Sequence, residues 1–396
     1  MDTVVHTDTP PPAPTAVSSS AYRQKADGAS LSLDKSGCFT ALERNNIFDL
    51  LRFIAATLVI YAHSFPMLGA GHDPLDTVSG INFGSLGVSL FFVLSGFLIT
   101  RSWLSNPKIG SYMGARCLRI FPALIFSLLF TVFAIGAPVT SVTLPKYFTS
   151  PVTLEFLSNV FLFPIHYPLP GVFTSNPLPG AVNGSLWSLP VEFMMYGVVL
   201  ALGLLGILQR KFLLLAATIA CLLLDIFALS TPAFASRVEL TVLVGPSFNM
   251  ALYFLLGGCF FLFRQEIPKN WRCALVAALS WYLSFKTPYL RTVSYLALPY
   301  LFFYLAALPL PALRKFAKYG DFSYGLYVFA FPVQQLLVHL QPHKLSVSEL
   351  FAQAFTITLL LAVTSWHLVE SPCLKLKRHL RPKLSEPGSQ PNKVIA

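Results

Sequence analysis

The segment Ile47-Phe-Asp-Leu-Leu-Arg52-Phe-Ile-Ala-Ala-Thr-Leu-Val-Ile-Tyr-Ala-His63-Ser-Phe-Pro66 decides the fold class, because it is long and apolar yet carries ionisable residues. Ten residues separate Arg52 from His63. On an α-helix, eleven steps of about 100° return to within roughly 20° of the starting direction and rise by roughly 16 Å. The two side chains are therefore predicted to share one face of a membrane-spanning helix. Ionisable groups are costly inside a membrane, and by default they indicate a functional site.

The composition of the chain indicates an all-α, polytopic membrane protein. Of its 396 residues, 55% are hydrophobic and 11% are charged, whereas a soluble domain is about 25% charged. Apolar stretches of about 17 to 25 residues predict transmembrane helices. The chain has about ten of them, near residues 47–67, 84–104, 120–138, 186–207, 212–230, 246–263, 273–286, 292–310, 322–340 and 350–370. The six cysteines lack CxxC spacing, so neither a disulfide framework nor a metal site is predicted.

Both ends of the chain are predicted to be disordered and cytoplasmic. Residues 1–42 are rich in Pro and Ser and have no apolar periodicity, residues 43–380 form the transmembrane domain, and residues 381–396 form a basic tail. With this orientation, the cytoplasmic segments hold 22 of the 28 Lys and Arg residues. Such an asymmetry follows the positive-inside rule. It explains the net charge of +11 without nucleic-acid binding.

Six short motifs follow one another along the chain. They are Ile47-Phe-Asp-Leu-Leu-Arg52 with Tyr61-Ala-His63-Ser64, Gly87-Val-Ser-Leu-Phe-Phe-Val-Leu-Ser95-Gly-Phe-Leu98, Arg116-Cys-Leu-Arg119-Ile-Phe-Pro122, Gly184-Ser-Leu-Trp187-Ser-Leu-Pro-Val-Glu192, Ser323-Tyr-Gly-Leu-Tyr327 and Val369-Glu370-Ser-Pro372. In this order they resemble the membrane-bound acyltransferase family 3, over roughly residues 43 to 380. Two positions depart from many relatives: Phe193 replaces a second acidic residue, and Ala330 replaces a His. The glycan O-acyltransferase type without an appended esterase-like domain is expected.

The resemblance implies that an acyl group, usually acetyl, is transferred from cytoplasmic acyl-CoA to a hydroxyl of an extracytoplasmic or lipid-linked polysaccharide or oligosaccharide. Acetyl-CoA would be the donor substrate, and no permanently bound cofactor or metal is expected. The expected partners are acyl-CoA, a glycan acceptor, membrane lipid and polysaccharide-assembly proteins. The expected location is the bacterial inner (cytoplasmic) membrane, which the chain crosses many times.

Seven residues are candidates for the site. His63 is the candidate general base, because an imidazole is mostly neutral at physiological pH and can accept a proton from a sugar hydroxyl; it can alternatively be acylated transiently. Glu192 is predicted to orient the imidazole or the sugar. Arginine forks match phosphate oxygens, so the donor is predicted to bind at Arg116 and Arg119, and Arg52 is a further candidate for substrate binding. Ser95, as an oxyanion donor, and Trp187 complete the candidates for substrate binding.

Each candidate also has a structural interpretation. Arg52 can pair with Asp49 on the same helix face. Arg116 and Arg119 can serve only to fix the membrane topology of the chain. Ser95-Gly96 can be a small-residue helix contact, Trp187 an interfacial residue, and Glu370 a helix-end or ion-pairing residue.

Two other functions stay open. A transporter or flippase of lipid-linked sugar also uses buried charges, although residues 47–210 and 212–370 show no internal repeat. An acyltransferase acting on a small molecule, such as a macrolide or a lipid headgroup, is the other.

Overall fold

The computed structural model describes residues 38–43, 47–230, 245–342 and 344–378. The account below concerns the described residues from Cys38 onward. Their regular elements are helices, and these described residues include no strand, only one isolated bridge between Cys38 and Pro268. The all-α fold class is confirmed.

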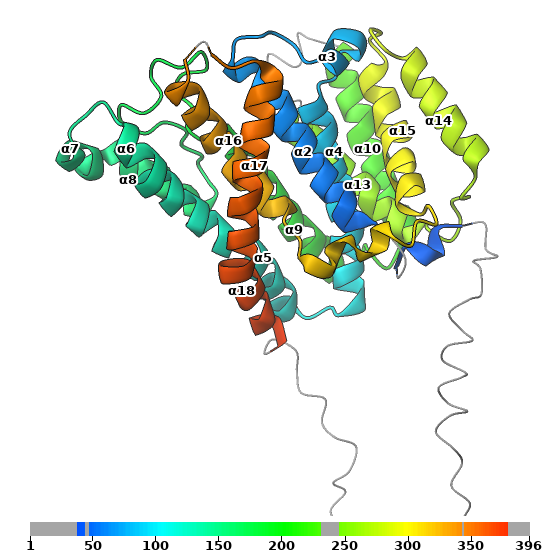
Figure 1. Ribbon diagram of the computed structural model, residues 1–396. Coiled ribbons are helices and arrows are strands. Elements are labelled where there is room, and N and C mark those ends of the chain that lie inside the picture. The colour runs from blue at the N-terminus through cyan, green and yellow to red at the C-terminus, as the bar shows by residue number, and fades with distance from the viewer. Residues whose placement is uncertain (1–37, 44–46, 231–244, 343, 379–396) are drawn as a thin grey trace, which may run out of the picture. The chain divides into compact units, whose positions relative to one another are not determined.

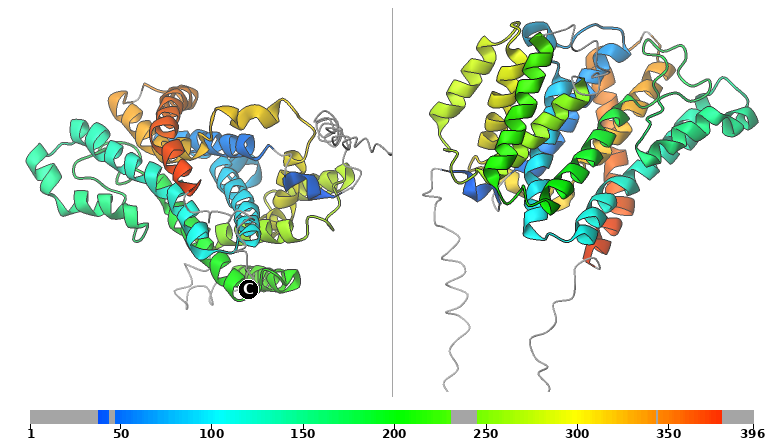
Figure 2. Two further views of the ribbon diagram at one scale, coloured as in Figure 1. Left: turned by 90° about the horizontal axis from the view of Figure 1, so that it is seen from below. Right: turned by 180° about the vertical axis from the view of Figure 1, so that it is seen from behind.

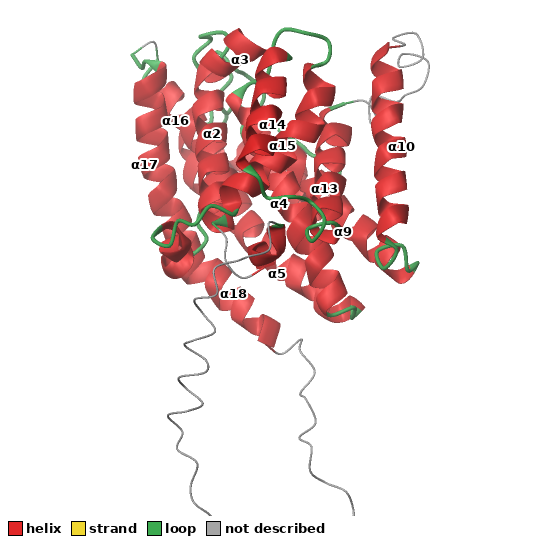
Figure 3. Cartoon of the chain, turned by 90° about the vertical axis from the view of Figure 1, so that its right-hand side faces the viewer, coloured by secondary structure: helices red, strands yellow, loops and turns green. Residues whose placement is uncertain are grey.

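A helix lies at each of the ten predicted spans. These helices are α2 (Phe48–Met67), α4 (Phe83–Ser105), α5 (Ile109–Leu129), α9 (Ser188–Leu204), α10 (Lys211–Ser230), α13 (Pro246–Leu262), α14 (Trp271–Leu283), α15 (Leu290–Ala306), α16 (Ser323–Leu340) and α17 (Val347–Ser365). Figure 3 shows several of them running side by side. Five stretches of the described chain are long and apolar enough to cross a membrane: Phe48–Met67, Phe83–Ser105, Ile109–Val139, Gly184–Leu204 and Val347–Lys375. The chain is thus a membrane protein, whereas the count of ten spans stays a prediction.

Shorter elements connect these helices. They are η1 (Phe39–Glu43), α3 (Pro74–Ser79), η2 (Phe130–Gly136), α6 (Ala137–Val139), α7 (Leu144–Thr149), α8 (Pro151–Ser158), η3 (Asn159–Phe161), η4 (Gly184–Trp187), η5 (Leu313–Tyr319), η6 (Trp366–Glu370), α18 (Ser371–Lys375) and η7 (Leu376–Arg378). The part from α6 to α8 lies at one edge of the helices, beyond α16 (Figures 1 and 2).

Two sequence predictions need correction. The predicted disordered arm, residues 1–42, extends too far, because Phe39 and Leu42 are fully buried and the Phe39 amide donates to the Arg264 carbonyl oxygen at 2.9 Å. The third span is predicted at 120–138, but its helix begins at Ile109. Hydropathy alone misses this first part of the helix because it carries arginines. Residues 1–37 and the predicted tail, residues 381–396, lie outside the described residues.

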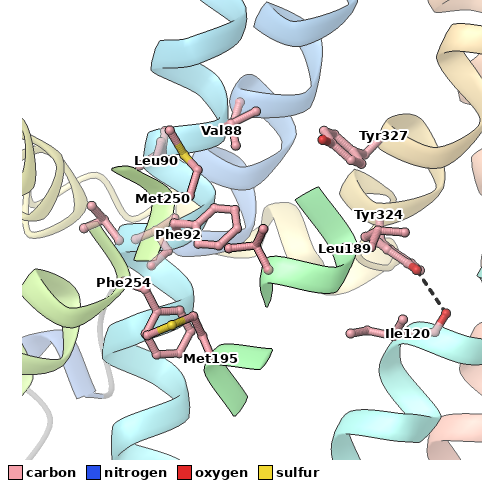
Figure 4. Packing of buried hydrophobic residues seen from close by; sticks show 14 of the residues in the cluster. Val88, Leu90, Phe92, Ile120, Leu189, Met195, Met250, Phe254, Tyr324 and Tyr327 are labelled. Carbon is pink, nitrogen blue, oxygen red and sulfur yellow. Dashed lines mark hydrogen bonds between the residues drawn. The ribbon is translucent and has the colours of Figure 1, made fainter. Parts of the chain in front are cut away.

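Helix α4 packs closely against α13 and also contacts α2, α9 and α15. A Cβ atom on Gly96 would lie 1.9 Å from the Phe254 carbonyl oxygen, and one on Gly257 would lie 2.1 Å from the Val93 carbonyl oxygen. The two backbones therefore touch, as small residues permit in membrane helix pairs. The predicted small-residue contact is confirmed for Gly96. Apolar side chains of α4, α9 and α13 fill the space beside this contact (Figure 4).

Segments that the sequence assigns to the same side of the membrane meet in the structure. The Lys286 amide donates to the Ser79 carbonyl oxygen at 3.0 Å, and both residues belong to predicted outer segments. Lys211 pairs with Glu266, and both belong to predicted inner segments. These contacts agree with the predicted alternation of the helices, while the end that faces the cytoplasm stays a prediction.

Candidate active site

Five of the seven predicted site residues line one cavity of about 210 Å³, which we call the arginine cavity. Helices α2, α4, α5 and α9 contribute them, and α16 closes the cavity with Tyr324 and Tyr327. The five residues are Arg52, Ser95, Arg116, Arg119 and Glu192. The three arginines thus line one cavity, and their predicted roles in substrate binding stay predictions.

Asp321, just before α16, joins two of these arginines. Its Oδ2 atom lies 2.6 Å from Arg119 Nη2 and 3.5 Å from Arg52 Nη1. Burial by itself would raise the pKa of the Asp321 carboxyl. The guanidiniums of Arg119 and Arg52 and the hydrogen bonds from Ser323 together have a larger, opposite effect, so the pKa lies below its ordinary value. The ion pair of Arg52 is therefore with Asp321, and the proposed pairing with Asp49 on the same helix is not the one observed.

Arg119 has a second carboxylate beside it. Glu370 Oε2 lies 3.7 Å from Arg119 Nη1, and the hydroxyl of Ser365 donates to Glu370 Oε1 at 3.0 Å. The prediction that Glu370 forms an ion pair is confirmed. The Arg119 guanidinium also lies over the ring of Tyr324, 5.6 Å from its centroid. These contacts hold Arg119 in one orientation at the cavity wall.

Glu192 belongs to the arginine cavity and not to the surroundings of His63. Its Oε1 atom accepts hydrogen bonds from Tyr196 Oη at 2.6 Å and from Ser95 Oγ at 3.1 Å. The Tyr196 ring in turn lies 5.8 Å from the guanidinium carbon of Arg116. These contacts place Glu192 beside the arginines, in a different cavity from the imidazole, and its expected role in orienting the imidazole or the sugar stays a prediction. The Ser95 hydroxyl is bound to this carboxylate, so it is not aimed at an oxyanion beside His63.

Two asparagines connect the segment before α9 to α16. Asn183 Nδ2 donates to the Val328 carbonyl oxygen at 3.0 Å, and Asn176 Nδ2 donates to Gln335 Oε1 at 2.7 Å. These bonds hold the segment before α9 against α16 inside the bundle. The start of helix α9, which carries Glu192, is thereby fixed relative to α16.

His63 lines a second cavity of about 740 Å³, which we call the histidine cavity. The imidazole is half-buried and meets the Phe331 ring edge-on, with 5.2 Å between centroids. In the described part of the chain, its Nδ1 atom is buried and has no hydrogen-bond partner. Trp187 lines the same cavity. An imidazole without a carboxylate partner in an apolar wall favours the neutral form.

The two cavities meet at Val88 and Tyr327, which line both of them. Figure 4 shows these two side chains pointing toward one another from α4 and α16. The Tyr327 hydroxyl lies 2.6 Å from Ser188 Oγ, and the Phe91 ring lies 5.8 Å from the Tyr327 ring. Val88 and Tyr327 therefore form a wall that the arginine cavity and the histidine cavity share.

A family model described as an acyltransferase domain matches residues 45–367. The chain belongs to acyltransferase family 3. An "O-acetyl transferase" of Shigella phage Sf6 is 27% identical over 359 residues, which are 87% of this chain and 99% of the relative. "Nodulation protein 10" of Rhizobium leguminosarum bv. viciae is 28% identical over 366 residues, 85% of this chain and 95% of the relative. No solved structure matches the chain.

This acyltransferase has site residues that the sequence analysis missed. Asp321 is 202 positions from Arg119, so no local pattern pairs them, although its place directly before the Ser323-Tyr324 motif was a usable signal. Tyr196 follows Glu192 by four residues, a spacing that puts both on one helix face. In the described residues no group of three or more His, Cys, Asp or Glu side chains could hold a metal ion.

Proposed function

We propose that this acyltransferase moves an acetyl group from cytoplasmic acyl-CoA to a hydroxyl of an extracytoplasmic or lipid-linked polysaccharide or oligosaccharide. The observation that carries the proposal is the pair of cavities that share Val88 and Tyr327. One cavity is rich in arginine and suits a polyanionic donor, and the other presents an imidazole to a neutral hydroxyl. The relative named O-acetyl transferase, which aligns along 99% of its length, supports acetyl as the acyl group.

The donor would bind in the arginine cavity. Guanidinium groups bind phosphate oxygens through two parallel hydrogen bonds. Among the described residues, Arg52 and Arg119 form ion pairs with carboxylates, whereas Arg116 forms none. Its guanidinium lies between the rings of Tyr112 and Tyr196, 5.9 and 5.8 Å from their centroids. Arg116 would therefore bind a donor phosphate, while Asp321 fixes Arg52 and Arg119 beside it. The uncharged pantetheine arm would then extend toward Val88 and Tyr327.

His63 would act where the thioester meets the acceptor. In a direct transfer, an imidazole nitrogen takes the proton of the acceptor hydroxyl, the oxygen attacks the thioester carbonyl carbon, the C–S bond breaks, and the CoA thiolate receives the proton. In a two-step transfer, the imidazole nitrogen first displaces CoA and forms an acyl-imidazole, which the acceptor hydroxyl then attacks. Both routes need the acyl group to pass the wall at Val88 and Tyr327.

The role of His63 can be tested by replacing it. We expect His63→Ala to abolish acetyl transfer while the protein still accumulates in the membrane. His339→Ala is the matched control, because His339 is another half-buried histidine near a helix end, in contact with Phe173 rather than with either cavity. Near-normal acetylation by the His63→Ala protein would refute the proposed chemistry.

The donor site is tested by kinetics with acetyl-CoA. Hydrogen bonds to charged groups contribute about 1.5–3 kcal/mol each, so Arg116→Ala should raise the apparent KM for acetyl-CoA by roughly tenfold to hundredfold. Arg272→Ala, which changes an exposed arginine on α14, should leave this KM unchanged. An unchanged apparent KM for acetyl-CoA in the Arg116→Ala protein would show that Arg116 does not bind the donor and affects only the membrane topology.

The acceptor class is tested in cells. Mass spectrometry of surface glycans from cells with and without the gene product should reveal one acetyl group per modified sugar that depends on the protein. An unchanged glycan together with an acetylated small molecule would instead favour the small-molecule alternative. The bacterial cytoplasmic membrane, and assembly with polysaccharide-producing proteins, are part of the same proposal.

A further inference from the structure

A polar network on α10, α13 and α15 lies beside the histidine cavity and has no role in the chemistry proposed above. Arg291 forms an ion pair through Nη2 with Asp225, and its Nε atom donates to Tyr295 Oη at 3.1 Å. The Tyr295 hydroxyl donates to Asn249 Oδ1 at 2.5 Å. Asn249, Arg291 and Tyr295 all line the cavity that His63 also lines.

The network is oriented by a buried charge. Asp225 is fully buried, whereas the Arg291 side chain is 26% exposed. Pairing with a carboxylate compensates the charge of the arginine, whose guanidinium carries five N–H donors. The Asn249 side chain adds both a donor and an acceptor, and the rings of Tyr253 and Tyr295 add aromatic surface to the same wall. A ligand site with convergent polar groups on an aromatic wall is typical of small-molecule recognition.

The charges around the cavity indicate what kind of ligand fits. Apart from Arg291 and the imidazoles, the charged residues lining its described part are Asp73 and Asp76. Asp73 accepts from the backbone amides of Asp76 at 2.9 Å and Phe83 at 2.8 Å, so it is fixed in place as a carboxylate acceptor. An anionic ligand would meet the Asp73 carboxylate, whereas Arg291 is already paired with Asp225 and Asp76 with His72, and like charges repel each other. The hydroxyls of an uncharged sugar can use the same donors and acceptors without this cost.

We propose that the wall formed by Asn249, Arg291 and Tyr295 is the acceptor subsite, and that it takes an uncharged sugar residue through its hydroxyl groups. This inference rests on the proposed function, because the sugar would present its hydroxyl to His63 across the same cavity. It assigns recognition of the acceptor to α13 and α15, whereas α5 and α9 bind the donor. Because Arg291 is paired with Asp225, this subsite binds a sugar that carries a uronate or phosphate group less well than an uncharged sugar.

Tyr295→Phe tests the subsite with purified protein in lipid nanodiscs. The acceptor is surface glycan isolated from cells that lack the gene product, and the donor is radiolabelled acetyl-CoA. The substitution removes one hydroxyl that accepts from Arg291 and donates to Asn249; a hydrogen bond contributes about 0.5–1.5 kcal/mol. We therefore expect the apparent acceptor KM to rise by roughly two- to tenfold, with the binding of acetyl-CoA unchanged. Tyr304→Phe, the same change on the same helix outside the cavity, should change neither.

A purely structural role gives a different result. If the network only holds α10 against α15, Tyr295→Phe will lower the thermal stability and leave the acceptor KM equal to that of Tyr304→Phe, which would overturn the proposal. Asp225→Asn gives an independent test, since it releases the charge of Arg291. We expect it to increase the relative transfer to a glycan rich in uronic acid, compared with a neutral glycan, by several-fold.

The natural acceptor gives the last test. Mapping the acetylated residue in surface glycans by tandem mass spectrometry should place it on an uncharged sugar, and an acetyl group found on a uronic acid would refute the selectivity. If no glycan acetylation depends on the protein, the proposed function itself fails, which is a distinct outcome.

Discussion

Asp321→Asn removes the carboxylate that joins Arg52 to Arg119 and keeps the size of the side chain. Breaking a buried ion pair on one side costs about 3–5 kcal/mol, because the remaining charge stays buried without its partner. Here the three side chains are 14–21% exposed, and Glu370 stays 3.7 Å from Arg119. Both features reduce the cost, so we expect the free energy of unfolding to fall by about 2–4 kcal/mol.

The stability can be followed with a thiol-reactive dye, because Cys259 on α13 is a free thiol that is only 7% exposed and reacts on unfolding. Glu266→Gln is the matched control: it makes the same chemical change at an exposed ion pair with Lys211, where pairs contribute little. The pKa of Asp321 is lower in the folded protein, so its stabilisation is present above the unfolded pKa and is lost as the pH falls through the folded pKa. The difference between wild type and Asp321→Asn should therefore stay constant from about pH 8 to about pH 5 and shrink only in stronger acid. A loss no larger than that of Glu266→Gln would refute the proposed role of Asp321.

Two further predictions concern the fold. Gly257→Ala should destabilise the protein by about 1–3 kcal/mol through overpacking, because its Cβ would lie 2.1 Å from a carbonyl oxygen of α4. Gly197→Ala should not destabilise it, because a Cβ there meets open space. Equal stabilities of the two variants in the dye assay would contradict the contact. Reporter fusions after residues 211 and 315 should read cytoplasmic and fusions within 140–180 should not, and the reverse pattern would overturn the orientation.

The sequence predicts the helices well because each of them needs a long apolar stretch. Hydropathy locates the helical cores, and every predicted span coincides with a helix. It fails at helix ends that carry charge, as at Ile109–Arg119, where the helix continues but the apolar signal does not. It also fails at η1, because the burial of Phe39 and Leu42 depends on partners such as Phe260 and Tyr300, which lie far along the chain.

The site is predicted in its residue types and only partly in its pairings. The periodicity of α2 places Arg52 and His63 on one face, and each of them does line a cavity. The partner of Arg52 is Asp321, however, and the hydrogen bonds of Glu192 are made to Ser95 and Tyr196. Sequence gives the position of a residue along its helix, but not its partners on other elements, such as Asp321 for Arg52 and Ser95 for Glu192.

Under the proposed function, the separation of Arg52 from His63 would let one helix contact both an anionic donor and an uncharged acceptor. Acyl-CoA carries several negative charges, and a cation-rich cavity that attracts it would also attract any anionic group of an acceptor. Under the proposed function, the arginines on one side of Val88 and Tyr327 would hold the donor phosphates, and the imidazole on the other side would meet the thioester. The imidazole then lies in a cavity where the one lining arginine is neutralised by Asp225, so CoA gains nothing by moving further. Under the proposed function, the charge pattern that binds the donor also stops it at the depth where its thioester, and no phosphate, reaches His63.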